Sequence, residues 1–145
     1  MLYLDLETRS QGDLIFHGLR RYAEHPTTEL ISIAYAFDDD EIVFRWATDP
    51  FPQSIIDHIN DGGLLMAHNA EFERHIFKYV LTRTHGVPEP RIEQWRCSMA
   101  MALANGYAAG LDAMAKGLGL PYQKNPHGTR LIREYSAPGH KDIFA

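Results

Sequence analysis

The opening stretch of the chain constrains its fold more than any other part. Leucine recurs at every second position, at Leu2, Leu4 and Leu6, and this period of two predicts a β-strand whose leucines face a core. Asp5 and Glu7 then project together from the opposite face, about 7 Å apart along the strand. Neighbouring acids are costly to cover unless a cation lies between them. A divalent metal site is one interpretation, and the solvent-exposed end of a strand is the other.

Length and composition favour one domain. A chain of 145 residues with 45% hydrophobic content can build one core and not two, so we expect a single domain over 1–145. The net charge of -5 argues against a protein that coats duplex DNA. The single cysteine, Cys97, excludes an internal disulfide and fits a reducing cytoplasm. We find no signal-peptide pattern, and the longest apolar run, 30–37, is too short to span a bilayer, so no membrane partner is expected.

Three further segments have the character of strands. Residues 30–37 and 41–46 flank an aspartate-rich turn, and together with the opening strand they predict an antiparallel meander. Residues 12–26, which lie between the opening strand and the strand at 30–37, are expected to form a loop with a short turn. Residues 64–67 are apolar without alternation, which is typical of a strand in the middle of a covered sheet.

Helical periodicity dominates the rest of the chain. An isoleucine-rich helix is expected to begin near Asp49 and to end at Gly62. Four more helices are expected at 71–84, 97–105, 111–118 and 128–135. This order of elements predicts an α/β domain with helices over a mixed sheet.

Glu73 is the least expected residue of the predicted 71–84 helix. At about 100° per residue it falls near the middle of the apolar stripe that should face the core. An inward-facing carboxylate must meet a cation or shift its pKa. An ion pair with Arg9 or Arg130 is one interpretation. Convergence with the two acids of the opening strand on a metal is the favoured one. The stripe consists of Phe72, Ile76, Phe77, Val80 and Leu81.

These residues resemble a known family. Asp5-Leu-Glu7-Thr-Arg followed by His68-Asn-x-x-Phe-Glu73 is similar to the first two motifs of the DEDD 3′–5′ exonucleases, which have a ribonuclease-H-like fold. The similarity extends to Gly18-x-x-x-Tyr22-Ala-x-x-Pro26-x-Thr28-Glu, to 111–120 with Lys124, and to 128–132. In this wider pattern the chain resembles the amino-terminal proofreading domain of phage-type family A DNA polymerases.

The resemblance implies a function and its residues. Asp5, Glu7 and Glu73 would be the catalytic residues and the ligands of two Mg²⁺ or Mn²⁺ ions, with Glu73 where the family usually has aspartate. The reaction would be hydrolytic removal of the 3′-terminal nucleotide of single-stranded DNA, in bacterial or phage-infected host cytoplasm. A polymerase domain, in the same or another chain, is an expected partner. The expected substrate contacts are Leu6, Thr8, His68, Asn69 and Phe72.

Two of these substrate contacts have a second interpretation. Asn69 is a residue type that holds tight turns, and its place between a strand and a helix favours that role. Phe72 belongs to the apolar stripe and is expected in the core. The preference for DNA over RNA rests on the resemblance alone.

One motif of the family is absent. Its third motif carries a fourth metal-binding aspartate on a closing helix, and no residue here fits. Asp142 lies in a proline- and glycine-flanked tail, and Asp112 reads as a first-turn helix acid. We therefore expect a ribonuclease-H-like domain, with a three-stranded antiparallel meander and a parallel central strand, that lacks its last helix.

Two alternatives remain open. A catalytically silent nucleic-acid-binding or polymerase-accessory module of the same fold would explain the absent fourth acid. A zinc hydrolase is disfavoured although the chain has 8 histidines, because His68 and His75 do not have a zinc-binding spacing.

Overall fold

The sheet places the opening strand at its centre. The computed structural model describes residues 1–145 and contains one five-stranded sheet of order β3-β2-β1-β4-β5. β1 pairs antiparallel with β2, and β2 with β3, whereas β1–β4 and β4–β5 are parallel. This confirms the predicted meander and the parallel strand in the middle of the sheet. The strands are β1 Leu2–Arg9, β2 Glu29–Phe37, β3 Val43–Trp46, β4 Leu65–Ala67 and β5 Trp95–Cys97.

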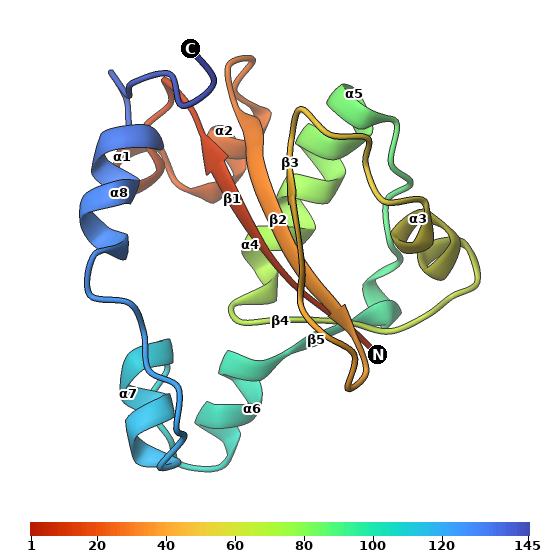
Figure 1. Cartoon of the computed structure of the whole chain (residues 1–145), viewed down its shortest axis with the longest axis vertical. Coiled ribbons are helices and arrows are strands. Elements are labelled where there is room, and N and C mark those ends of the chain that lie inside the picture. The colour runs from red at the N-terminus through yellow and green to blue at the C-terminus, as the bar shows by residue number, and fades with distance from the viewer.

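Helices flank this sheet, which gives the α/β fold that the sequence predicts and is consistent with a ribonuclease-H-like architecture (Figure 1). α4, the π-helical η1 and α5 follow one another without a break and end at Gly86, whose φ of 64° is the left-handed conformation of a helix end. None of the helices is long and apolar enough to cross a membrane. The helices are α1 Leu14–His17, α2 Leu19–Glu24, α3 Gln53–Asn60, α4 Ala70–Ile76, η1 Phe77–Leu81, α5 Thr82–His85, η2 Ile92–Gln94, α6 Ser98–Ala104, α7 Leu111–Gly117 and α8 Gly128–Tyr135.

The core lies between the leucine face of β1 and the α4–η1 helix. Leu2, Leu4 and Leu6 are buried, and Ile76 and Phe77 on the helix are fully buried against the same core cluster. Val80 and Leu81 complete the buried stripe. The predicted helix face therefore is the packed face.

The last third of the chain packs differently. From Ser98 onward only Ala102 and Ala115 are buried. Figure 1 shows α6 and α7 projecting away from the sheet, below it in that view. Apolar side chains stay exposed along this part of the chain, namely Met101, Leu103, Tyr107, Leu111, Leu118, Leu120, Tyr122, Leu131, Ile132 and Phe144.

Three predictions of local structure were wrong. Residues 12–26 form α1 and α2 rather than a loop, because the Asp13 carboxylate caps the backbone N–H of Phe16 and α2 packs against the core. The isoleucine-rich helix begins at Gln53, since Asp49 instead accepts a hydrogen bond from the Trp46 backbone. The β5 strand was not predicted, and Cys97, its last residue, precedes α6 instead of lying in it.

Truncation of Phe77 tests the position of the core. Phe77 is 0% exposed, so Phe77→Ala leaves a cavity and should lower the free energy of unfolding by about 3–5 kcal/mol. Phe16 is 84% exposed, so Phe16→Ala should change the free energy of unfolding by less than about 0.5 kcal/mol. Urea unfolding measures both. Similar losses in the two variants would contradict the packing described here.

Candidate carboxylate site

A short neighbouring strand leaves one side of β1 open. β4 pairs Leu65 with Leu2 and Met66 with Tyr3, and it ends at Ala67. The second half of β1 therefore has no strand partner on that side. The chain turns there through Asn69 into α4, so the first turn of α4 lies next to the acidic half of β1.

Asp5 and Glu7 both lie on the exposed face of β1, as the alternation predicts. The register of β1 and β2 shifts between Glu7 and Thr8, a bulge of the kind that bends a strand. Both carboxylates reach solvent, yet enough protein surrounds them to raise the pKa of each. The neighbouring His68 opposes the shift in the pKa of Asp5, whereas the charge of Asp5 adds to the shift in the pKa of Glu7.

Glu73 is buried without compensation. It is 3% exposed, and its Oε2 has no hydrogen-bond partner. Burial raises its pKa from 4.5 to about 8, and the charges of Asp5 and Glu7 add to that shift. No ion pair joins Glu73 to Arg9 or Arg130, and Arg9 pairs with Glu29 and Asp142 instead. The inward orientation predicted for Glu73 is confirmed, and the ion-pair interpretation is wrong.

The three carboxylates do not form a closed metal site as they stand. No three His, Cys, Asp or Glu side chains in the structure are close enough to hold an ion together. Metal binding by Asp5, Glu7 and Glu73 stays a prediction that requires their side chains to move together.

Two predicted substrate contacts lie inside the protein. Leu6 packs in the core cluster, and Thr8 is buried with its Oγ1 2.8 Å from the hydroxyl of Tyr22. These contacts give both residues a role in supporting β1. Their contact with a nucleotide stays a prediction.

The remaining three predicted contacts surround the turn into α4. Asn69 has a φ of 63°, the left-handed conformation that asparagine tolerates, which fits the turn-holding role. Phe72 is partly buried and packs against the core, as its place in the apolar stripe predicts. His68 Nε2 donates to the carbonyl of Ala109 at 2.8 Å, while its Nδ1 lies 3.0 Å from Ser98 Oγ. His68 thus ties the end of β4 to the chain beyond α6.

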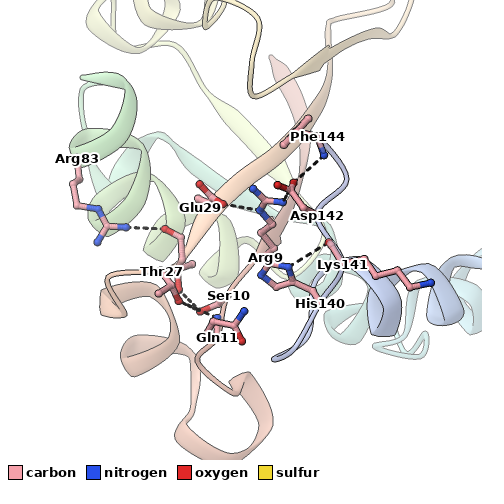
Figure 2. A network of polar contacts seen from close by, with 11 residues as sticks. Arg9, Ser10, Gln11, Thr27, Glu29, Arg83, His140, Lys141, Asp142 and Phe144 are labelled. Carbon is pink, nitrogen blue, oxygen red and sulfur yellow. Dashed lines mark hydrogen bonds and ion pairs between the residues drawn. The ribbon is translucent and has the colours of Figure 1, made fainter.

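The two acids considered for the absent fourth ligand are engaged elsewhere. Figure 2 shows Asp142 against Arg9, with an Nη1–Oδ1 distance of 2.7 Å, while Arg9 Nε bonds Glu29 at 2.6 Å. The Arg9 guanidinium lowers the pKa of Asp142. Asp112 lies in the first turn of α7 and pairs with Lys116. Neither acid joins Glu73, in agreement with the interpretation from the sequence.

Sequence reasoning missed two neighbours of the carboxylates. Lys124 lies near enough to lower the pKa of Glu7, against the shift caused by burial and by Asp5. The Cys97 Sγ accepts hydrogen bonds from the backbone N–H groups of Ala70 and Ala100, which lowers the pKa of the thiol against its burial. The contact of Lys124 with Glu7 and that of Cys97 with Ala70 join segments distant in the sequence, and spacing contains no signal for them.

The buried carboxyl of Glu73 makes folding depend on pH. The unfolded group loses its proton near pH 4.5, whereas the folded group keeps it to about pH 8. The folded state binds more protons between these values, so the free energy of unfolding falls as pH rises, by at most about 1.4 kcal/mol per pH unit. Glu73→Gln should remove this contribution. Urea unfolding with a chelator, at several pH values across this window, measures it.

The control is Glu71→Gln, which alters an exposed acid in the same helical turn. It should keep the pH dependence of the unmodified chain. Equal slopes for Glu73→Gln and the unmodified chain would contradict a buried, protonated Glu73.

Comparison with known proteins relates the chain to a replication enzyme. It is 35% identical over 144 residues to a DNA polymerase of Bacillus phage SP02, an alignment that covers 94% of this chain and 21% of that polymerase. The chain therefore spans about one fifth of the length of this relative. A comparison with protein-family models finds no match. The chain is thus similar to one segment of a phage DNA polymerase, an enzyme of nucleic-acid metabolism.

Proposed function

We propose that the chain acts as a 3′–5′ exonuclease that proofreads DNA synthesis, as its motifs imply. The observation that carries the proposal is Glu73: a buried carboxylate with a free Oε2, facing two further acids on β1. A purely structural protein gains nothing from burying the carboxyl of Glu73, without an ion-pair partner, beside two further acids. An enzyme that binds divalent cations needs them. The similarity to a phage DNA polymerase supports the replication context.

The donor set fits magnesium or manganese. Asp5, Glu7 and Glu73 offer carboxylate oxygens, which hard divalent ions prefer, and the unpartnered Oε2 of Glu73 leaves a buried acceptor available. Asp5, Glu7 and Glu73 would hold these ions, which would supply activation of the attacking water and stabilisation of the charge on the leaving 3′ oxygen.

The protonation state of Glu73 affects how a cation would bind. Glu73 holds its proton at neutral pH because its pKa is about 8, and cation binding must displace that proton. The bound cation would then offset the negative charge that loss of this proton adds beside Asp5 and Glu7. Lys124, whose charge acts on Glu7, is a basic group that a substrate phosphate could contact.

The proposed substrate is the 3′ end of single-stranded DNA. The net charge of -5 does not favour broad phosphate coating, so we expect the strand to be held at its end, beside the three acids. A polymerase domain is the proposed partner, because the similar phage polymerase is almost five times as long as the matched segment.

One observation favours a second function. The three carboxylates are not close enough to hold a metal without rearrangement, and no fourth acid joins them. A silent nucleic-acid-binding or polymerase-accessory module would tolerate both features. Assays that measure hydrolysis of a DNA strand and binding of that strand separately distinguish the two functions.

A degradation assay tests the proposal. With Mg²⁺, a single strand labelled at its 3′ nucleotide should lose the label stepwise. Asp5→Ala should slow the loss by at least about 100-fold, because metal-based charge stabilisation is worth several kcal/mol and each 1.4 kcal/mol is about tenfold. Glu71→Gln, in the exposed part of the α4 first turn, should retain the rate.

The outcome separates the two candidates. Release that Asp5→Ala abolishes supports the exonuclease. Binding of the strand without release at any concentration of Mg²⁺ or Mn²⁺ would rule out the exonuclease for this chain and support the silent module.

A further inference from the structure

Tyr22 contacts the two elements that carry the carboxylates. On one side its hydroxyl lies 2.8 Å from Thr8 Oγ1, and both residues are buried. Thr8 directly follows Glu7 in β1, at the point where the strand register shifts. A buried hydroxyl pair of this kind is costly to break, because each partner would lose its hydrogen bond without gaining water.

On its other side Tyr22 packs against the first turn of α4. Its ring lies 6.3 Å from that of Phe72, centroid to centroid, at an interplanar angle of 36°. Phe72 directly precedes Glu73, and α2 packs against α4 more widely. One side chain of α2 therefore touches the residue next to Glu7 and the residue next to Glu73.

The backbone of Tyr22 is held in place as well. Thr28 Oγ1 donates to the carbonyl of Tyr22 and lies 2.7 Å from Ser10 Oγ, which in turn accepts from Gly12 N at 2.8 Å. Thr28 and Ser10 are almost completely buried. This network fastens the end of α2 to the end of β1, so Tyr22 cannot shift without displacing both.

We propose that Tyr22 is a positioning residue that fixes the distance between the β1 acids and Glu73. The inference rests on the proposed function, since the distance matters only if the three carboxylates share a cation. Once a cation displaces the proton of Glu73, the charge of Glu73 repels those of Asp5 and Glu7, and a rigid link between their backbones limits how far they separate. Supporting contacts of this kind lower the cost of assembling a metal site.

A purely structural role for Tyr22 would affect stability alone. We therefore compare Mn²⁺ affinity, measured by titration calorimetry, in variants that each remove one hydroxyl. Tyr22→Phe and Thr8→Val should weaken Mn²⁺ binding about 10–100-fold, the range found for supporting residues of metal sites. The double variant should lose no more than either single variant, because both remove the same hydrogen bond.

Tyr35→Phe is the matched control. Tyr35 is a buried tyrosine of β2 in the same core, and its ring packs against that of Phe37, with the centroids 6.1 Å apart. Tyr35→Phe also removes one hydroxyl group, and it should leave the Mn²⁺ affinity within about twofold of that of the unmodified chain. Thermal unfolding with a chelator verifies that every variant is folded.

Amide hydrogen exchange of the metal-free protein supplies a second readout. Loss of the link should speed exchange at residues 7–9 and 71–73 in Tyr22→Phe but not in Tyr35→Phe. If the unmodified chain binds Mn²⁺ and Tyr22→Phe binds it equally well, the positioning role is overturned and the proposed function stands. If the unmodified chain binds no Mn²⁺, the proposed function fails, and unchanged exchange in Tyr22→Phe would overturn the link too.

Discussion

The structure around β1 depends on one costly feature: the carboxyl group of Glu73 is buried close to two other acids, Asp5 and Glu7. Glu73 is held in place by the apolar stripe behind it, where Ile76 and Phe77 are fully buried, so its side chain cannot leave for solvent without unpacking α4. A buried charge without a partner costs several kcal/mol. The group therefore keeps a proton at neutral pH, because burial raises its pKa to about 8.

The arrangement of the backbone places the buried Glu73 next to the acidic half of β1. β4 is only three residues long, and its early end lets α4 begin beside the acidic half of β1. The left-handed Asn69 makes the turn, and the hydroxyl pair of Thr8 and Tyr22 joins β1 to α2. Arg9 pairs with Glu29 and Asp142, as Figure 2 shows, and forms no ion pair with Asp5, Glu7 or Glu73.

Much of this arrangement could be predicted from periodicity. A period of two placed Asp5 and Glu7 on one face, and a period of 3.6 turned Glu73 toward the core. Contacts between distant segments could not be predicted this way. The short helices α1 and α2 depend on a cap at Asp13 and on packing of Tyr22, and β5 exists through its pairing with β4. The hydrogen bond between Thr8 and Tyr22 spans 14 residues. Whether the carboxylates close around an ion depends on side-chain positions that no sequence pattern specifies.

The central claim is that these three carboxylates share one cation site. Crystals of the chain grown with Mn²⁺ would test it most directly through the anomalous scattering of the metal. The account predicts an anomalous peak coordinated by Asp5, Glu7 and Glu73, whose side chains have moved together. A peak bound elsewhere, or none at saturating Mn²⁺ with the Glu73 Oε2 still unpartnered, would contradict it.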